Sequence, residues 1–200
     1  MKIKKVKIIN YLINPITIKQ LLNFILIQKK NKVGRYICVS SVHGCIESFF
    51  NKKFKIAHNT ANIAIPDGRP IFWALKLLDT NNAEHLPGYH VTEKICSHAI
   101  TNKLKLGFFG STDKTLNKLE KKLNKKYKNL SINYKFSPPF RKISIEEDKK
   151  IISKINQSKI DVLFVCLGCP KQELWMYEHK HKLKCTMIGV GAVVDFLSGN

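Results

Sequence analysis

Four carboxylates lie shortly after segments that are predicted to be buried strands, where side chains can act on a bound molecule. They are Asp67, Asp113, Glu173 and Asp195. Because the whole chain has only 14 Asp and Glu residues, few groups are available to act as a catalytic base. Asp67 follows the apolar run 63–65 and a proline, and a glycine comes after it. Its carboxylate therefore suits a general base in low-dielectric surroundings, although Pro-Asp-Gly is also an ordinary turn sequence.

A second set of reactive or binding residues follows the apolar run 161–167. Gly168 comes first, and a proline then opens a predicted helix that begins with Lys171, Gln172 and Glu173. Lys171 can meet a phosphate, and Gln172 can form a hydrogen bond with a uracil or a sugar hydroxyl. Glu173 can bind a ligand or cap the helix start, and the residues alone leave both interpretations open.

Glycines also follow the last predicted strand, at Gly189 and Gly191, with Asp195 shortly after them. This pattern lacks the third glycine of a dinucleotide fingerprint and lies on the last predicted strand instead of the first. We therefore expect no nicotinamide cofactor. The glycines still allow the backbone to approach a ligand closely. Three histidines, His43, His85 and His90, lie near predicted loops without a Ser or Cys at triad spacing, which favours structural histidines.

The cysteine pattern does not favour a metal site. The six cysteines lie in apolar segments, where free thiols act as small hydrophobic side chains. Cys166 and Cys169 form one C-x-x-C pair with no second pair, and His179 and His181 lack the histidine spacing of a zinc finger. We expect no bound metal and reduced thiols in the cytoplasm.

The elements that position these residues alternate between strands and helices. Strands are predicted at 5–9, 36–42, 63–65, 105–109, 131–136, 161–167 and 186–190. Helices are predicted within 21–26, 71–78, 91–100, 116–123, 151–155 and 174–177. Ser144 and Glu147 form a capping-box pattern at the start of one helix. Apolar strands separated by helices predict an α/β fold, a Rossmann-like layered single domain over residues 1–200 with a mostly parallel sheet flanked by helices.

The net charge of +21, from 35 Lys and Arg residues against 14 Asp and Glu, favours polyanionic partners without choosing among them. Lysines on a solvent-exposed face that binds no ligand explain the same net charge. No RNP-like strand, zinc finger or helix-turn-helix pattern supports nucleic-acid binding. The N-terminal segment is too short and polar for an export signal, and the apolar run 162–167 is far shorter than the roughly 20 residues of a membrane span.

Taken in order, five motifs of the chain resemble those of the WecG/TagA/CpsF glycosyltransferase family. They are PDGRPIFWA from Pro66, LPG from Leu86, FFG from Phe108, GxPKQExW from Gly168 and GVGAxxDFxxG from Gly189. The resemblance covers about residues 36–200, and residues 1–35 fit the variable N-terminal strand and helix of the family.

This resemblance implies the inverting transfer of a hexosamine or hexosaminuronic acid of the N-acetylmannosamine type. The donor would be a UDP-sugar, and the acceptor would be N-acetylglucosamine linked to undecaprenyl diphosphate, in cell-surface polysaccharide or teichoic acid synthesis without an obligatory metal. Asp67 matches the proposed general base of the family and Gln172 its donor-pocket glutamine. The expected substrate-binding residues are Ser41, His43, Arg69, His85, Gly110, Gly168, Lys171, Gln172, Glu173, Gly189, Gly191 and Asp195.

Some positions depart from the family pattern. Val39 replaces a threonine, His85 replaces an arginine that could steady the departing diphosphate, and His90 replaces an aspartate. With His85, charge stabilisation depends on pH or passes to Lys171 or Arg69. A catalytically inactive relative that acts as a scaffold therefore remains the alternative, ahead of a basic nucleic-acid-binding protein.

The sequence printed here stops at residues 197–200, where family members continue with a basic, aromatic tail that helps to close the site and hold the membrane. We expect a truncated chain, or a site completed by a neighbouring subunit in a homo-oligomer, and low activity for this form. Basic side chains predict peripheral binding to the anionic inner face of the cell membrane.

Overall fold

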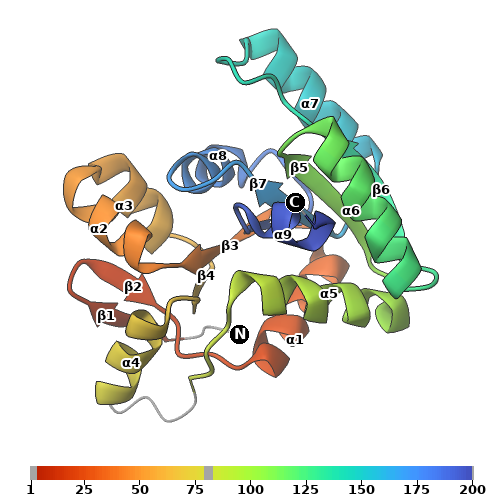
Figure 1. Ribbon diagram of the computed structural model, residues 1–200. Coiled ribbons are helices and arrows are strands. Elements are labelled where there is room, and N and C mark those ends of the chain that lie inside the picture. Colours follow the sequence, from red (N-terminus) through yellow and green to blue (C-terminus); the bar gives the residue numbers. More distant parts are fainter. Residues whose placement is uncertain (1–3, 79–82, 200) are drawn as a thin grey trace.

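Six strands pair side by side in one parallel sheet, in the order β4-β3-β8-β7-β5-β6 (Figure 1). The computed structural model describes residues 4–78 and 83–199. The strands of this sheet are β3 Arg35–Ser40, β4 Ile63–Pro66, β5 Lys105–Gly110, β6 Ser131–Phe136, β7 Val162–Cys166 and β8 Thr186–Gly189. The α/β fold expected from the sequence is thereby confirmed, with β8 in the middle of the sheet.

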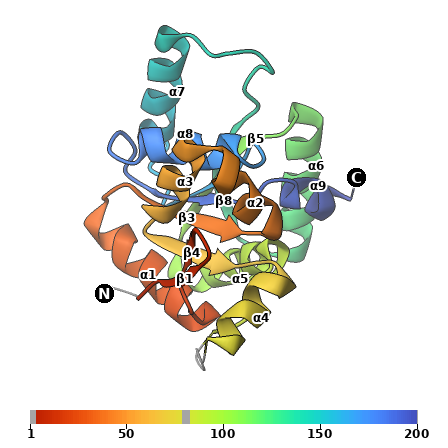
Figure 2. The same cartoon turned by 90° about the vertical axis from the view of Figure 1, so that its left-hand side faces the viewer.

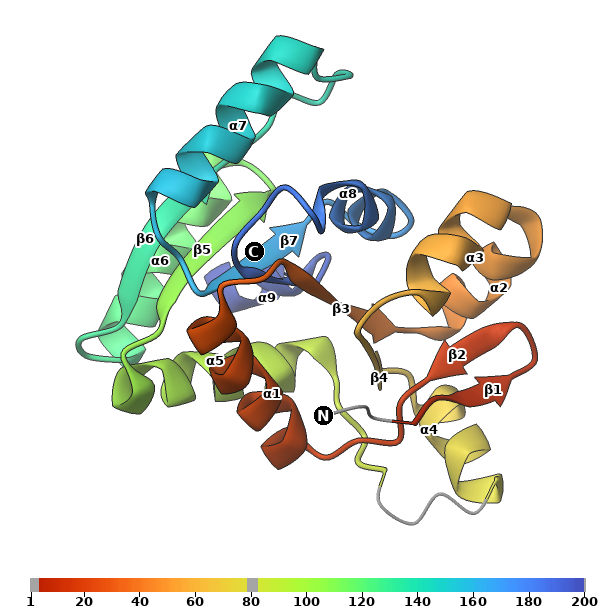
Figure 3. The same cartoon turned by 180° about the vertical axis from the view of Figure 1, so that it is seen from behind.

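Helices cover both faces of the sheet. They are α1 Ile18–Asn31, α2 Val42–Phe50, α3 Lys52–Asn59, α4 Arg69–Leu77, α5 Gly88–Asn102, α6 Asp113–Lys126, α7 Ile145–Gln157, α8 Lys171–His179 and α9 Val193–Ser198. Apolar side chains of α1, α5, α6 and α9 pack on one face, and those of α3, α4, α7 and α8 belong to the core of the other. Figure 3 shows α1 and α5 on the opposite side of the sheet from α3 and α8.

Strand β7 is apolar throughout because both of its faces are buried. In β7, Val162 and Phe164 belong to the core shared with α1 and α5, whereas Leu163 and Val165 belong to the core shared with α7 and α8. Successive side chains of a strand point to opposite faces, so a strand covered by helices on both sides needs no polar position. This explains the continuous apolar runs on which the sequence prediction depended.

A small antiparallel hairpin, β1 Val6–Ile8 and β2 Tyr11–Ile13, forms a second sheet that lies beside β4 (Figure 2). The chain leaving it runs along the edge strand β4. There the backbone N–H of Asn14 donates to the carbonyl of Ala64 at 2.8 Å, and the Ala64 N–H donates to the Asn14 side-chain oxygen at 2.8 Å. These bonds satisfy backbone groups of β4 that an open sheet edge would leave unpaired.

All seven predicted strands are present, but one boundary and several elements differ from the prediction. Strand β3 ends at Ser40 and not at residue 42, because the hydroxyl of Ser41 caps α2 by accepting a hydrogen bond from the Gly44 N–H. Strand β2 and helices α2, α3 and α9 were not predicted. The predicted capping box of Ser144 and Glu147 is confirmed at the start of α7. The helices within 4–78 and 83–199 are each too short or too polar to cross a lipid bilayer.

Candidate active site

The loops that carry the candidate residues follow β3, β4, β5, β7 and β8, so they lie along one edge of the sheet. Parallel strands direct their carboxyl ends to the same edge, and open α/β sheets bind ligands there. The expected site residues thus share this edge although they span positions 41–195. They form two clusters, one around Asp67 and one around the glycine-rich loop after β8.

Asp67 is the centre of the first cluster. Its half-buried carboxylate accepts a hydrogen bond from the Gly88 N–H at 2.8 Å, where α5 begins. Its backbone N–H donates to the Ser40 carbonyl at 3.1 Å, which fixes the turn between β4 and α4. Its own carbonyl lies 2.5 Å from Nε2 of His85, and since a carbonyl only accepts, His85 carries its proton on Nε2. One hydrogen bond thus orients the carboxylate, and two others fix the backbone of Asp67.

Electrostatics favour Asp67 as a base. Burial raises the pKa of this carboxyl above its ordinary value, and the Gly88 N–H and the nearby His85 oppose that rise without cancelling it. A raised pKa makes the carboxylate a better proton acceptor near neutral pH. A raised pKa is thus a property that Asp67 shares with general bases.

The second cluster centres on the side chain of Gln172, which is 4% exposed in the first turn of α8. Its Oε1 accepts the N–H of Gly191 at 2.9 Å, and its Nε2 donates to Oε1 of Glu173 at 2.9 Å. Gly189 leaves room for these side chains, because a Cβ would lie 2.8 Å from Met176 Cε and 3.1 Å from Gln172 Cδ. Gln172 therefore fixes the loop after β8.

Glu173 is buried beside Gln172, with 2% of its surface exposed. Its second oxygen, Oε2, has no hydrogen-bond partner among the described residues. Burial raises the pKa of this carboxyl to about 7. Glu173 is thus a buried carboxyl in the first turn of α8 whose pKa lies near neutral pH.

The end of β5, at Gly110 and Ser111, also borders the second cluster. Gly110 ends β5 with φ +118°, where a Cβ would lie 2.4 Å from the Cys166 carbonyl oxygen. The Ser111 hydroxyl donates to the Asp195 carboxylate at 3.2 Å, which joins the β5 loop to α9. At Gly88, a Cβ would lie 3.2 Å from Val193 Cγ2, so the start of α9 also borders the Asp67 cluster. The two clusters are therefore neighbours.

A cavity of about 400 Å³ opens beyond the ends of β5, β6 and β7. Apolar side chains of Phe109, Phe140 and Leu167 line it together with three cations, Lys171, Arg141 and Lys142. Arg141 forms a two-bond ion pair with Glu147, at 2.7 and 2.8 Å. Lys171 lies here and not beside Asp67.

The remaining expected residues also lie at this edge, and the Gly168 carbonyl accepts the Gln172 backbone N–H at 2.9 Å. His43 and Arg69 are exposed in the first turns of α2 and α4. Ser41 is occupied as the cap of α2, at 3.3 Å from the Gly44 N–H. Gly168, at φ +76°, has open space around the position of a Cβ. Within the described part of the chain, no three His, Cys, Asp or Glu side chains are grouped as metal ligands would be.

Comparison with known proteins identifies the family of the chain. Residues 6–200 match the sequence profile of the "Glycosyl transferase WecG/TagA/CpsF family". The chain belongs to this family. The resemblance seen in its motifs is thus confirmed over nearly the whole sequence.

Curated relatives in the WecG/TagA/CpsF family include two named N-acetylglucosaminyldiphosphoundecaprenol N-acetyl-beta-D-mannosaminyltransferases. The chain is 28% identical to the one from Staphylococcus aureus (strain NCTC 8325 / PS 47) over 142 residues, which cover 70% of this chain and 54% of the relative. It is 21% identical to the one from Bacillus spizizenii over 168 residues, which cover 84% of this chain and 63% of the relative. The matched part thus spans little more than half the length of these relatives.

Several contacts of the candidate site were not singled out from the sequence. Gly88 supplies the hydrogen bond to Asp67, and Ser111 the hydrogen bond to Asp195. Arg141 and Lys142 add charge to the cavity beside Lys171. Gly88 ends the LPG motif, and Ser111 directly follows Gly110, an expected site residue. The sequence could therefore have indicated both. Arg141 and Lys142 follow the Pro-Pro pair after β6. This pair indicates a loop at the end of the strand, but it does not indicate which cavity the loop lines.

Proposed function

We propose that the chain transfers an amino sugar of the N-acetylmannosamine type, or its uronic acid, from a UDP donor to N-acetylglucosamine on a polyprenyl diphosphate. Family membership and the names of the two relatives support this activity. The observation that carries the proposal for this chain is Asp67, a strand-end carboxylate oriented by Gly88 with a raised pKa.

In the proposed reaction, an acceptor hydroxyl attacks the anomeric carbon of the donor from the side opposite the UDP group. The bond from that carbon to the UDP oxygen breaks as the new glycosidic bond forms, which inverts the configuration. Asp67 takes the hydroxyl proton and later releases it to water. One carboxylate suffices, because a diphosphate is a good leaving group.

Charge develops on the diphosphate as it leaves, and cations near it lower the barrier. We assign the nucleotide to the cavity after β5, β6 and β7, where Lys171 and Lys142 supply charge and Phe109 and Phe140 supply apolar surface. His85 offers a second route only when its ring is charged, since its Nε2 proton is engaged by the Asp67 carbonyl and Nδ1 donates only in the imidazolium form.

Release of UDP tests this function. UDP-hexosamines and their uronates are supplied with a short-chain lipid-diphosphate N-acetylglucosamine acceptor, and the unaltered chain is compared with Asp67→Asn. We expect acceptor-dependent UDP release, reduced by a factor of about 100 to 10,000 in the variant. Asp113→Asn is the matched control, because Asp113 lies at the same sheet edge but is exposed at the start of α6.

The alternative outcomes are distinct. Equal loss in Asp67→Asn and Asp113→Asn would remove Asp67 from the role of base. No release with any donor would favour the inactive scaffold. Because a thermal unfolding curve of each variant accompanies the assay, misfolding is separated from loss of chemistry.

Peripheral membrane binding is part of the proposal, because the proposed acceptor is anchored in a bilayer. Helices α2 and α4 begin at the loops of Ser41 and Asp67 and expose large apolar side chains. On α2 and α4 these are Val42, Ile46, Phe49, Phe50, Trp73 and Leu77. Lysines beside them add about 1 kcal/mol each near anionic headgroups. We propose that this apolar surface contacts the inner face of the membrane.

A further inference from the structure

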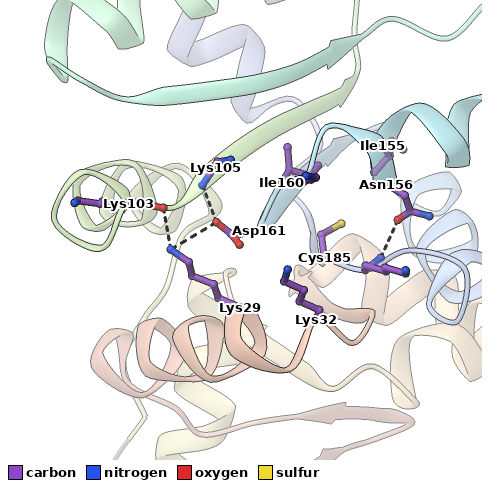
Figure 4. A pocket seen from close by; sticks show the side chains of 11 residues that line it. Lys29, Lys32, Lys103, Lys105, Ile155, Asn156, Ile160, Asp161 and Cys185 are labelled. Carbon is purple, nitrogen blue, oxygen red and sulfur yellow. Dashed lines mark hydrogen bonds and ion pairs between the residues drawn. The ribbon is translucent and has the colours of Figure 1, made fainter.

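A second cavity, of about 440 Å³, lies at the edge of the sheet opposite Asp67, where β5, β7 and β8 begin (Figure 4). Lysines come to it from α1, from the end of α5, from the start of β5 and from the loops before β7 and β8. They are Lys29, Lys32, Lys103, Lys105, Lys159 and Lys184. The proposed transferase reaction uses none of them.

The lining carries a large surplus of positive charge. Its one carboxylate, Asp161, accepts the backbone N–H of Lys105 at 2.9 Å and lies 3.9 Å from the ammonium of Lys29. Lys29 also donates to the carbonyls of Asn102 and Lys103, at 2.8 Å each. Within residues 4–78 and 83–199, the ammonium groups of the other five lysines form no ion pair or hydrogen bond. Five cations therefore border the cavity without a partner.

Helix ends account for only part of this charge. Helices α1, α5 and α7 end beside the cavity, with C-caps at Lys32, Lys103 and Ser158. A helix C-terminus acts as about half a negative charge, so the three ends together supply roughly −1.5. Five unpartnered ammonium groups exceed that value by a factor of about three. The remaining positive charge favours the binding of an anion.

The walls of the cavity are fixed before any ligand arrives. Asn156 donates from Nδ2 to the Lys182 carbonyl at 3.0 Å, and its Oδ1 accepts the Lys184 N–H at 3.1 Å. Asp161 holds the start of β5 in the same way, through the Lys105 N–H. The floor is buried and consists of Ile155, Ile160 and Cys185. A rigid frame with a buried floor distinguishes this cavity from a solvated lysine face.

We propose that this cavity binds a small, multiply charged phosphate compound of the diphosphate class. Its volume lies in the range of small-molecule sites, and lysine ammonium groups are common phosphate ligands. A soluble compound is favoured over a lipid headgroup, because the membrane-binding surface proposed above lies at the other edge of the sheet. The preference for a soluble compound over a lipid headgroup rests on the proposed function, whereas the proposed affinity for phosphate does not.

Lysine footprinting tests the site residue by residue. The chain is acetylated briefly with and without inorganic diphosphate, and the modification of each lysine is measured by mass spectrometry. We expect diphosphate to slow the acetylation of Lys103, Lys105 and Lys184 at least about fivefold. The exposed α6 lysines Lys114 and Lys121 should be unaffected. Since each lysine is read separately, binding of diphosphate near Asp67 does not enter the result.

Substitution gives an independent readout. In Lys103→Gln/Lys105→Gln/Lys184→Gln, the protection of Lys32 and Lys159 by diphosphate should be lost. The control Lys114→Gln/Lys121→Gln/Lys125→Gln removes the same charge from α6 and should retain it. All six substituted side chains are exposed, so neither variant removes core packing.

Two outcomes would overturn the proposal. Equal protection of the cavity and α6 lysines would reduce the effect to general screening of a basic protein. Protection by vesicles of phosphatidylglycerol and phosphatidylcholine, but not by diphosphate, would identify a lipid surface instead. Loss of UDP release in Asp67→Asn with unchanged lysine protection would separate this site from the proposed transferase site.

Discussion

The Asp67 carboxylate and the Gly88 N–H are joined by a hydrogen bond of 2.8 Å, which connects the end of β4 to the first turn of α5. The bond orients the carboxylate, and it also favours the charged form of Asp67. Burial has the larger effect, so the pKa of Asp67 is raised overall. The contact thus fixes the direction of the base without making it too weak to accept a proton.

His85 should act by positioning Asp67. His85→Ala removes the donor to the Asp67 carbonyl, and we expect kcat to fall by about ten- to a hundredfold with little change in donor KM. His85→Gln restores an N–H donor and should recover most of the rate. Steady-state kinetics of UDP release measure both variants. A Gln variant as slow as the Ala variant would show that the ring does more than donate this bond.

Glu173 should make the folded state less stable as pH rises. Its pKa is about 7 in the folded chain against 4.5 ordinarily, so its stabilising contribution is complete below pH 4.5 and is lost as pH rises through about 7. Glu173→Gln should therefore gain up to about 3 kcal/mol over the unaltered chain at pH 8, and almost nothing at pH 4.5. Urea unfolding at both pH values measures this. The exposed Glu146→Gln is the control, and an equal gain there would contradict the assignment.

Gln172 should stabilise the loop after β8. Gln172→Met keeps the volume but leaves the Gly191 N–H and Glu173 Oε1 without their partner, which we expect to cost about 1–3 kcal/mol in the free energy of unfolding. Gln157→Met, at an exposed position of α7, should change it by less than about 0.5 kcal/mol. Similar costs in both variants would argue against a special role for Gln172.

Gly110 and Gly168 form a matched pair with different constraints. A Cβ at Gly110 would lie 2.4 Å from the Cys166 carbonyl oxygen at φ +118°, whereas Gly168 at φ +76° has nothing within 4 Å. We expect Gly110→Ala to cost about 3 kcal/mol or more, and Gly168→Ala about 1–2 kcal/mol. Thermal unfolding distinguishes the two. A smaller cost at Gly110 would mean that β5 can shift away from β7.

Membrane binding should depend on the apolar side chains of α2. Phe49 and Phe50 are 51% and 86% exposed, and replacing both with Ser should weaken sedimentation with anionic vesicles by about tenfold or more. Val33→Ser, at the opposite sheet edge, should leave it unchanged. High salt should release the unaltered chain in part, because lysines contribute. Equal binding of all three proteins would place the contact elsewhere.

The layered fold could be predicted because both faces of the sheet are buried, and this leaves apolar runs that mark the strands. Helix α2 escaped prediction for the opposite reason: Ile46, Phe49 and Phe50 face outward, so its apolar pattern does not follow the core. Helix α9 was hidden by the glycines before it, since Gly191 takes a left-handed turn and the helix then begins at Val193.

The candidate site was predictable only where a residue lies at a strand end. Asp67 had that signal, because four buried residues precede it. The lysine cavity at the other edge had no such signal in the sequence. Its lining residues are separated by up to 155 positions, from Lys29 to Lys184, and the order of the strands in the sheet brings them together. Single motifs report local turns, whereas strand order determines which distant loops share an edge.

The central place of β8 also governs how the chain can acquire its structure. Strand β8 pairs with β3 on one side and β7 on the other, so it is the only described strand that joins the β4-β3 pair to the β7-β5-β6 group. During synthesis the two groups emerge first and must wait for residues 186–189 to leave the ribosome. Until then β3 and β7 expose unpaired apolar edges, so folding should be slow and sensitive to chaperones.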